Sequence, residues 1–585
     1  MKNSKPKLII LTTFVEILIL FALTIKLGTS GNTTVRWANV FPYIGILSVM
    51  IYIMLLIYMS KFKNYLIKII EIICGFIQNY SCEIFMLSFS VYLIIYEIYY
   101  AYCENIFISP DSGNYLREAT ALVNGYGFNV SGPAGTYSWF SNWPIGYPCL
   151  IALVALLTGQ NVYLSSKILS ILLVIAGMLF FYKYFKKKAW IFCLTYCNIG
   201  FLDIYKYTWS ENPFILCFIL YTFLLTEIIT NPKNKNYIYL IICSFLTFLM
   251  RYFGGITVII TSLVIIGYIL LFFCFREYHT ATVKDKIIKL IVTNIVSSIL
   301  MIGYWAINKI KTGRISGVDR LKWTDDYLEL TDNLYSALKT EVLNATRISS
   351  FKTIDSMDTS ILSVAMLFIA LIIILLILNQ IKKGIDYKVV CIITGVIYYL
   401  LFIVVRYYSY MDLFGYRFFV PGTMLIMIGL LGFIEEKLES LAPQICIFAT
   451  ALLIPLIFSL FSQVFVYNTS STAYASVKKE ILSELEEVPT QSVLPAYDEN
   501  IYITYVMRPD ITLYKKDIDT TLELDEWIKQ YSAFPFVCIK TSVLEENVLN
   551  QESSESFLDL LTTVKKSQNT KNYIVLSTND GSIKN

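Results

Sequence analysis

The chain has 585 residues, of which 56% are hydrophobic and only 15% are charged. Soluble domains carry more charge than this, so the composition favours a protein that crosses a membrane many times. The formal net charge of +4 is small and scattered along the sequence, which argues against nucleic acid as a partner.

Cysteine and histidine usage narrows the chemistry further. Most of the twelve cysteines lie in apolar runs, where they behave as small hydrophobic residues. No Cys-x-x-Cys pair occurs, so the pattern indicates neither a zinc site nor a disulfide framework. The single histidine, His279, leaves little room for histidine-based catalysis or for histidine-rich metal sites.

Thirteen apolar windows approach the length of about 20 residues that a membrane-spanning helix needs. They lie near residues 7–27, 40–59, 82–102, 162–182, 190–207, 210–229, 237–252, 254–275, 287–307, 361–380, 389–408, 417–434 and 445–466. The first window is too long for a cleavable signal and is not followed by a small-residue cleavage site, so we expect it to remain as a span. The sequence thus predicts a polytopic α-helical membrane protein with about 13 transmembrane helices.

The basic residues predict the orientation of these spans, because short cytoplasmic loops collect lysine and arginine. With the N-terminus inside, the loops on the predicted inner side carry Lys61, Lys63 and Lys68, then Lys183 and Lys186–Lys188, then Lys233 and Lys235, then Arg276, Lys284 and Lys286, and finally Lys382 and Lys383. We therefore expect a cytoplasmic N-terminus. The abundance of Ile, Lys, Asn and Tyr is typical of an AT-rich bacterial genome, so the expected location is the bacterial cytoplasmic membrane.

Two loops on the predicted outer side are long, residues 103–161 and 308–360. Within the first of them, Ile145–Thr158 is apolar but too short to cross the bilayer. We expect this stretch to form an interfacial or half-inserted helix that ends at Gly159.

The sequence divides into three predicted parts. Residues 1–80 form an N-terminal extension with two spans, and residues 81–466 form the main transmembrane module. Residues 467–585 are polar, with strand-like runs alternating with helix-like ones, which predicts a small soluble α/β domain. With thirteen spans and a cytoplasmic N-terminus, this domain is expected outside the cytoplasm.

Asp111 begins a short amphipathic segment in the first outer loop. Apolar residues follow it at helical spacing, and Asn124-Gly125 ends the pattern. Ser109 or Asp111 would cap this helix, and the helix dipole favours a carboxylate at that end. Alternatively, an ionised Asp111 exposed at the membrane interface accepts a proton from an incoming nucleophile.

Four more charged residues lie at outer ends of predicted spans: Glu211, Asp203, Arg251 and Arg417. An acid at that depth is costly unless it faces water, a cation or a partner. Structural explanations remain open, since Asp203 can pair with Lys206 one turn on, and arginines can reach back to the interface. Acids and arginines gathered at one interface also suit a phosphorylated lipid, because arginine binds phosphate through charge-assisted, often bidentate hydrogen bonds.

Short motifs around these residues carry a family resemblance. They are, in chain order, Asp111 in the outer loop, Pro144-Ile145-Gly146-Tyr147-Pro148 before the short helix, the span entry Lys167–Leu172, Glu211, Arg251 and Tyr416-Arg417-Phe418. This order resembles the GT-C superfamily of membrane glycosyltransferases. It is similar in particular to the branch related to protein O-mannosyltransferases and the lipid A aminoarabinose transferase, with residues 81–466 as the GT-C-like catalytic module.

The resemblance implies that a sugar is moved from a polyprenyl-phosphate donor to an acceptor hydroxyl at the outer membrane face, with inversion at the anomeric carbon. Asp111 is then the general base, and Glu211 orients the acceptor or a basic partner. Arg251 and Arg417 hold the donor phosphate. Asp203, Tyr137, Trp143, Tyr147 and Tyr416 are expected either to contact substrate or to support the residues that do.

The expected partners are the polyprenyl-phosphate sugar donor, a glycan, lipid or protein acceptor, and membrane lipids. The sequence indicates no certain cofactor. Binding of a divalent cation at Asp111 stays an open alternative, although one carboxylate supplies few of the oxygen ligands that Mg²⁺ needs. The loop also lacks the adjacent acidic pair of the protein mannosyltransferases, and two spans precede the span before it where family members usually have one.

Two other functional classes fit the same composition. A lipid-linked sugar flippase or transporter also has many spans, but it places charges near the bilayer midplane and often shows inverted repeats. A polysaccharide polymerase or ligase uses the same donor class and typically places arginines in a late outer loop. The loop 308–360 carries Arg314, Arg320 and Arg347, which keeps that alternative open.

Overall fold

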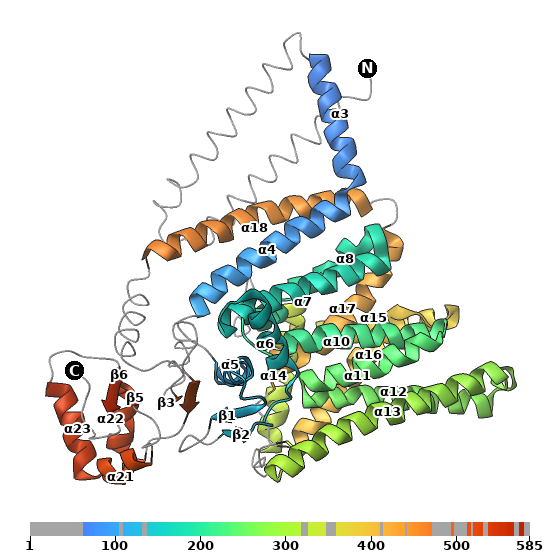
Figure 1. Cartoon of the computed structure of the whole chain (residues 1–585). Coiled ribbons are helices and arrows are strands. Elements are labelled where there is room, and N and C mark those ends of the chain that lie inside the picture. The colour runs from blue at the N-terminus through green and yellow to red at the C-terminus, as the bar shows by residue number, and fades with distance from the viewer. Residues whose placement is uncertain are drawn as a thin grey trace. The chain divides into compact units, whose positions relative to one another are not determined.

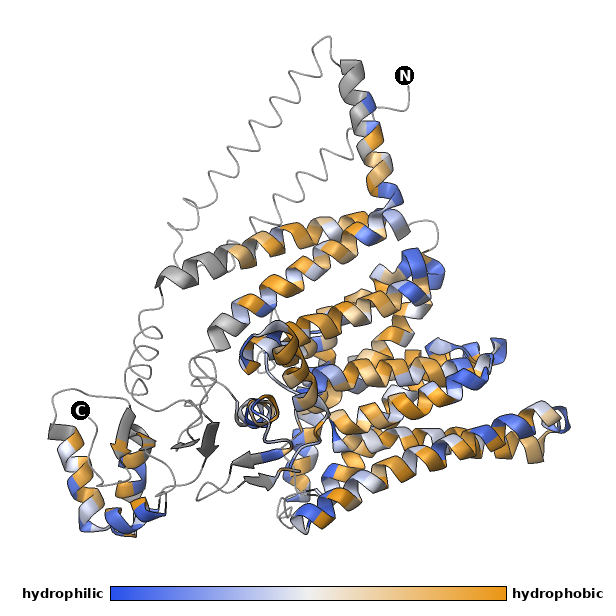
Figure 2. Cartoon of the chain, viewed as in Figure 1, coloured by the Kyte–Doolittle hydropathy of each residue, from blue (hydrophilic) through white to orange (hydrophobic). Residues whose placement is uncertain are grey.

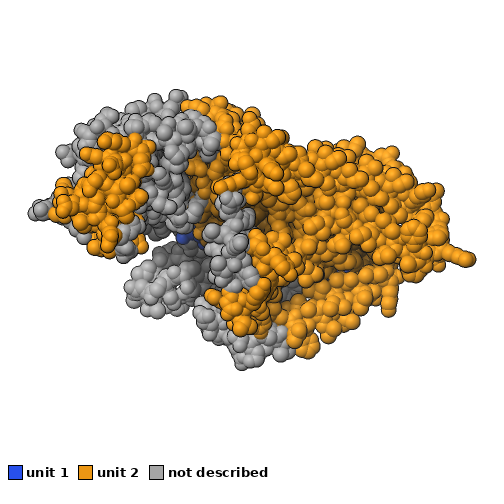
Figure 3. All heavy atoms as spheres, turned by 90° about the horizontal axis from the view of Figure 1, so that it is seen from below, with its two compact units in different colours: residues 1–102, 175–195, 431–470 blue, residues 103–174, 196–430, 471–585 orange. Residues whose placement is uncertain are grey.

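The computed structural model of the chain describes residues 63–104, 109–131, 137–316, 326–346, 359–409, 414–438, 442–470, 493–496, 512–515, 519–530, 536–550, 552–566 and 573–577. The chain divides into two compact units (Figure 3). Unit 1 contains residues 1–102, 175–195 and 431–470, and unit 2 contains residues 103–174, 196–430 and 471–585. The boundaries predicted at residues 80 and 466 stay predictions.

Helices dominate the described residues (Figure 1). In chain order, with η marking 3₁₀ helices, they are α3 (Lys63–Asn79), α4 (Ser81–Glu104), α5 (Pro110–Val123), α6 (Gly146–Thr158), α7 (Val162–Phe185), η2 (Lys186–Lys188), α8 (Ala189–Cys193), η3 (Leu194–Cys197), α9 (Ile199–Tyr205), α10 (Glu211–Thr230), α11 (Asn234–Met250), η4 (Tyr252–Gly255), α12 (Ile256–Cys274), η5 (Arg276–Tyr278), α13 (Ala281–Thr312), α14 (Tyr327–Ala345), α15 (Thr359–Lys383), α16 (Tyr387–Tyr408), α17 (Tyr416–Lys437), α18 (Ala442–Ser470), α21 (Leu524–Lys529), α22 (Thr541–Asn550) and α23 (Glu555–Lys566). The strands are β1 (Asn129–Ser131), β2 (Tyr137–Trp139), β3 (Val493–Ala496), β4 (Thr512–Lys515), β5 (Phe536–Lys540) and β6 (Tyr573–Ser577).

Eight described helical segments are long and apolar enough to cross a membrane. They are Ser81–Tyr100, Val162–Cys197, Glu211–Thr230, Tyr252–Cys274, Ala281–Thr312, Met366–Lys383, Tyr387–Tyr408 and Tyr416–Lys437. Hydrophobic residues cover most of the length of these helices, and hydrophilic residues gather near many of their ends (Figure 2). The chain is therefore an integral membrane protein. The predicted spans 7–27 and 40–59 lie outside the described residues, so the count of thirteen stays a prediction.

One of the predicted spans in the described residues is broken into shorter helices. Residues 190–207 form α8, η3 and α9 rather than one helix. Asn198 explains the last break, because its side chain accepts a hydrogen bond from the backbone N–H of Phe201 and caps α9. The predicted span 237–252 is present as the single helix α11, whose 17 residues lie at the short end of the length range of membrane-spanning helices.

The short apolar helix expected in the first outer loop is present as α6. It ends at Gly159, whose φ of 66° is the left-handed conformation that favours glycine after a helix. Helix α6 packs against α5 and α11. Gly146 permits the second contact, since a Cβ atom there would lie 2.6 Å from the carbonyl oxygen of Leu249. The start of α6 is thus held close to the end of α11.

Helices α10 and α11 pack along each other and are joined by only a few residues, so they run antiparallel. Glu211 is the first residue of α10, and Arg251 directly follows α11. Both charged residues therefore lie at the same end of this helix pair. The pairing of α10 with α11 is the main element of the fold that positions the site.

The last described elements form a mixed four-stranded sheet with the order β4-β3-β5-β6. Strand β3 is parallel to both β4 and β5, and β5 is antiparallel to β6. Trp527, Val537 and Phe557 belong to a buried hydrophobic cluster beside this sheet. The sequence of this polar part predicts strands at 501–506, 534–539 and 573–576; β5 and β6 correspond to the last two, whereas 501–506 lies outside the described residues. A separate C-terminal α/β domain remains a prediction.

Candidate active site

The N-terminus of α5 presents Asp111 without using it as a cap. Ser109 is the N-cap, and its hydroxyl accepts a hydrogen bond from the backbone N–H of Ser112 at 3.1 Å. Pro110 occupies the first helical position, where its missing N–H costs nothing. The open choice between Ser109 and Asp111 is thereby settled, and the Asp111 carboxylate is available for other contacts.

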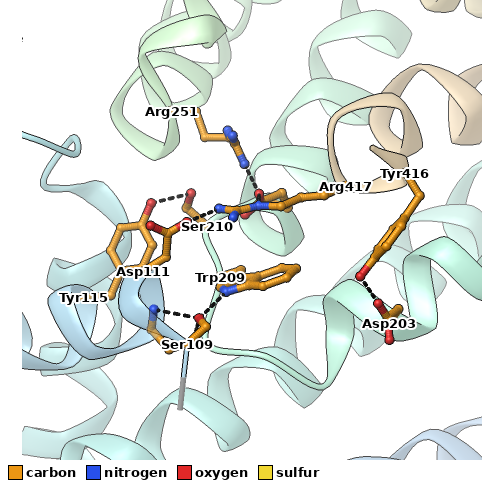
Figure 4. Close-up of polar contacts among 11 residues, drawn as sticks. Ser109, Asp111, Tyr115, Asp203, Trp209, Ser210, Arg251, Tyr416 and Arg417 are labelled. Carbon is orange, nitrogen blue, oxygen red and sulfur yellow. Dashed lines mark hydrogen bonds and ion pairs between the residues drawn. The ribbon is translucent and has the colours of Figure 1, made fainter. Parts of the chain in front are cut away.

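Arg417 joins the two acids that the sequence singles out (Figure 4). Its Nη2 forms an ion pair with Oδ2 of Asp111, and its Nε donates to Oε1 of Glu211. Nη1 of Arg251 pairs with the same oxygen of Glu211. Two carboxylates and two guanidinium groups thus alternate in one continuous network, drawn from α5, α10, α17 and the end of α11.

Exposure separates the two acids. The side chain of Glu211 is only 1% exposed, whereas that of Asp111 is 23% exposed. A buried carboxylate needs its cations, because an uncompensated charge in the interior is strongly unfavourable. Glu211 is therefore placed to hold both arginines, and Asp111 is the acid that a substrate can reach.

Residues just before Glu211 support the network. The Trp209 ring lies below the Arg417 guanidinium, with Cζ 4.2 Å from the ring centroid, and its Nε1 donates to the Ser109 hydroxyl at 2.7 Å. The Tyr115 hydroxyl donates to the Ser210 hydroxyl at 2.7 Å. These contacts fix α5 against the start of α10 (Figure 4).

Tyr115 is a stable hydrogen-bond donor in this setting. Burial raises the pKa of its phenol above the ordinary value, and the nearby carboxylates of Glu211 and Asp111 raise it further. The phenol therefore keeps its proton at physiological pH. It holds Ser210 in place and does not act as a base.

Asp203 and Tyr416 form a second, smaller contact at the edge of the network. The Tyr416 hydroxyl donates to Oδ2 of Asp203, and Lys206 pairs with Oδ1 of the same carboxylate. The expected pairing of Asp203 with Lys206 is thus present. Because Tyr416 directly precedes Arg417, this contact orients the first turn of α17 and with it the Arg417 side chain.

Two of the predicted aromatic residues, Trp143 and Tyr147, lie beside Tyr115. The ring centroid of Tyr115 lies 5.1 Å from that of Tyr147 and 6.0 Å from that of Trp143. Tyr147 is fully buried and Trp143 is half-buried. Tyr137 lies in strand β2. The role of these residues in substrate contact stays a prediction.

A divalent cation does not fit this donor set well. Among the described residues, no three His, Cys, Asp or Glu side chains come together. The carboxylates of Asp111 and Glu211 already hold guanidinium groups, whereas Mg²⁺ and Ca²⁺ need several oxygen ligands on one centre. The site as arranged is suited to an anion that competes for the arginines.

The sequence analysis named Ser109 as a possible cap but missed three residues of this site: Tyr115, Trp209 and Ser210. Two signals were available. Tyr115 lies four positions after Asp111, which places both on one face of α5. Trp209 and Ser210 directly precede Glu211, so any structure that fixes Glu211 also brings them close.

The arginines that would favour a polymerase or ligase are only partly described. Arg314 lies just after α13, whereas Arg320 and Arg347 lie outside the described residues. The long loop that the sequence predicts to be outer contains α14, which packs against α15 and α9. None of the contacts of the charged network described above involves Arg314.

The chain is similar to solved protein structures but matches no known protein family. No family model and no curated protein matches the chain. A crystal structure of ArnT from Cupriavidus metallidurans bound to undecaprenyl phosphate is similar with a TM-score of 0.47 and 10% identity, over 80% of this chain and 96% of that one. The archaeal oligosaccharyltransferase AglB from Archaeoglobus fulgidus, in complex with an inhibitory peptide and a dolichol-phosphate, is similar with a TM-score of 0.40 and 11% identity. The match covers 78% of this chain and 69% of that one.

Proposed function

We propose that this protein is an inverting glycosyltransferase that moves a sugar from a polyprenyl-phosphate donor to an acceptor hydroxyl at the outer face of the membrane. The observation that carries the proposal is the ion pair of the partly exposed Asp111 with Arg417, which shares the buried Glu211 with Arg251. An accessible base beside two arginines matches the needs of a reaction that deprotonates a hydroxyl and expels a phosphate.

Asp111 removes the proton from the acceptor hydroxyl as its oxygen attacks the anomeric carbon. The new bond forms on one face of the sugar while the bond to the phosphate oxygen breaks on the other, so the anomeric configuration inverts. The electron pair of the broken bond leaves on the phosphate. The proton ends on Asp111 and passes to solvent before the next turnover.

Arg251 and Arg417 bind the phosphate and stabilise the negative charge that it gains on leaving. Such preorganised charge stabilisation is usually the largest single contribution to catalysis. Glu211 acts as a positioning residue, since its one oxygen holds both guanidinium groups in place. The network is electrically neutral before the donor binds, so the arginines are stable in a largely buried site without substrate.

Substitution of Asp111 by Asn tests the base. The amide keeps the size of the side chain but cannot accept the proton, so we expect transfer to fall about a hundredfold or more. Donor affinity should not fall, because both arginines are retained and the Asp111 charge no longer competes with the phosphate for Arg417. The assay follows release of polyprenyl phosphate from radiolabelled polyprenyl-phosphate sugars by the purified full chain in membrane extracts that supply acceptors.

Asp285→Asn is the matched control, because Asp285 is an exposed carboxylate that pairs with Lys289 away from the network. It should behave as wild type. Wild-type turnover in the Asp111→Asn variant would remove Asp111 from the mechanism. Movement of intact donor across vesicle membranes without release of polyprenyl phosphate would instead support a flippase.

A further inference from the structure

Helix α5 carries a second buried acid that the proposed mechanism does not use. Glu118 lies seven positions after Asp111, which places it on the same helix face, two turns or about 10 Å further along. Its side chain is 6% exposed. Among the described residues, neither of its carboxyl oxygens has a hydrogen-bond partner.

Glu118 lies among polar groups that come from separate parts of unit 2. It is close enough to Cys149 of α6, Tyr252 of η4 and Tyr304 of α13 to interact with each of them electrostatically. The Tyr252 hydroxyl donates to the carbonyl oxygen of Ser141 at 2.7 Å. The Ser141 segment therefore borders the same polar cluster.

Two further polar atoms next to this cluster are also buried without a partner. The Ser141 hydroxyl and Nε of Arg117 make no hydrogen bond to any described residue. The Arg117 guanidinium lies over the Phe140 ring, with Cζ 5.3 Å from the ring centroid. An acid, a hydroxyl and a guanidinium nitrogen thus share a buried region with aromatic rings.

Structural packing does not explain this arrangement. A buried polar atom without a hydrogen bond destabilises the folded protein, and an apolar side chain of similar size would avoid that cost. Burial raises the pKa of Glu118 well above its ordinary value, which favours the protonated carboxyl, and a protonated carboxyl both donates and accepts a hydrogen bond. Such a group suits a hydroxyl of a neutral ligand better than a cation.

We infer that Glu118, with Ser141 and Arg117, forms a subsite that binds hydroxyl groups of the sugar carried by the donor. The inference rests on the proposed function, because a sugar linked to a phosphate at Arg251 and Arg417 extends from the same end of α5. Tyr115 lies between Asp111 and Glu118 on the same helix face and joins the two regions. Glu118 would then determine which sugar is accepted.

Stability gives the first test. Replacing Glu118 by Leu removes the buried acid, so the thermal midpoint of the purified full chain should rise or stay equal in the absence of ligand. Thr120→Val is the matched control on the same helix, since among the described residues the Thr120 hydroxyl bonds only to the carbonyl oxygen of Leu116 within α5. If the thermal midpoint of Glu118→Leu fell clearly below those of wild type and Thr120→Val, Glu118 would have a structural role and the inference would be overturned.

Binding gives the second test, with bare polyprenyl phosphate and a panel of polyprenyl-phosphate hexoses as probes. Wild type should bind at least one hexose donor more tightly than bare polyprenyl phosphate. In the Glu118→Leu variant this preference should fall about tenfold, with affinity for bare polyprenyl phosphate unchanged. Glu118→Gln should keep part of the preference, because an amide still donates and accepts.

Single-deoxy analogues of the preferred hexose locate the contact. Wild type should discriminate against one of them, and the Glu118→Leu variant should not, because the partner of that hydroxyl is gone. An equal preference for the hexose in wild type and variant would overturn the inference while leaving the proposed function intact. Failure of wild type to bind bare polyprenyl phosphate would instead count against the proposed function.

Discussion

At the scale of single residues, Arg417 is the group through which the site responds to a donor. Its guanidinium contacts both carboxylates, Asp111 through Nη2 and Glu211 through Nε. A phosphate that binds Arg417 competes with Asp111, the more exposed of the two acids, and not with the buried Glu211. Donor binding would therefore release Asp111 toward the acceptor while Glu211 keeps the arginine in place.

Arg251 offers the cleaner test of phosphate binding, because its removal leaves Arg417 to compensate Glu211. We expect Arg251→Ala to weaken affinity for polyprenyl phosphate about tenfold to a hundredfold, since hydrogen bonds to charged groups are the stronger kind. The affinity of Arg251→Lys should lie between those of wild type and Arg251→Ala, because lysine keeps the charge but not the bidentate geometry. The measurement is equilibrium binding of labelled polyprenyl phosphate to the purified chain.

Arg276→Ala is the control for that measurement, as Arg276 is exposed in η5. Its affinity should match wild type. An unchanged affinity in Arg251→Ala would assign Arg251 to the structural support of Glu211 alone.

At the scale of elements, the close contact between η4 and α11 sets the position of Arg251. The N–H of Gly254 donates to the carbonyl oxygen of Arg251 at 2.7 Å and closes the turn after α11. A Cβ atom on Gly254 would lie 2.3 Å from the carbonyl oxygen of Thr247. Because backbone atoms cannot rotate away as a side chain can, only glycine permits this turn.

Gly254→Ala should therefore displace Arg251 without changing any charged residue. We expect a lower thermal midpoint and a loss of polyprenyl-phosphate affinity comparable to that of Arg251→Ala. Gly255→Ala is the neighbouring control, because its nearest contact would be a side-chain atom of Phe248 at 4.0 Å. Equal affinities in the two glycine variants would show that the turn does not position the arginine.

Helix α14 carries a pH-sensitive contact with α17. Thr423 donates its hydroxyl hydrogen bond to Oε1 of Glu341, and the hydroxyl of Tyr399 lies beside Thr423. Burial raises the pKa of Glu341 from 4.5 to about 8, although the hydrogen bond from Thr423 lowers it. The folded protein thus holds this proton at pH values where the unfolded chain has lost it.

The sign of the effect follows from this difference. Glu341 contributes stability that is fully present below pH 4.5 and is lost as the pH rises through about 8. We expect the thermal midpoint to fall over this range and the fall to be smaller in Glu341→Gln, which cannot ionise. Glu329→Gln, an exposed change on the same helix, should keep the wild-type dependence of the thermal midpoint on pH. The same dependence in Glu341→Gln as in wild type would contradict the assignment.

At the scale of the whole molecule, the charged residues were predictable one by one, but their network was not. Asp111, Glu211, Arg251 and Arg417 each stand beside an apolar run, where a charge needs a reason. The ion pair of Arg417 with Asp111 joins positions 306 apart in sequence, so it depends on how helices pack. The burial of Glu118 is still harder to predict. In the sequence Glu118 stands next to Arg117 and looks like part of an exposed polar face, and it is buried by the packing of α6, η4 and α13 around it.

The orientation of the whole chain is the remaining premise of the proposed function. The network joins the start of α10, the end of α11 and the start of α17, so these ends share one side of the membrane. Charge counting predicts that this side is outer. The helix end at Cys274, which is exposed, then faces the cytoplasm, and α14, with the exposed Glu329, faces outward.

Thiol labelling in intact cells tests this arrangement with a matched pair of sites. In variants that retain one cysteine each, a membrane-impermeant maleimide should label Glu329→Cys directly, because the predicted outer loop meets the medium. Cys274 should react only after the membrane is permeabilised. The reverse pattern would place Asp111 and both arginines in the cytoplasm, where soluble nucleotide sugars are available, and an external polyprenyl-phosphate donor would no longer account for the site.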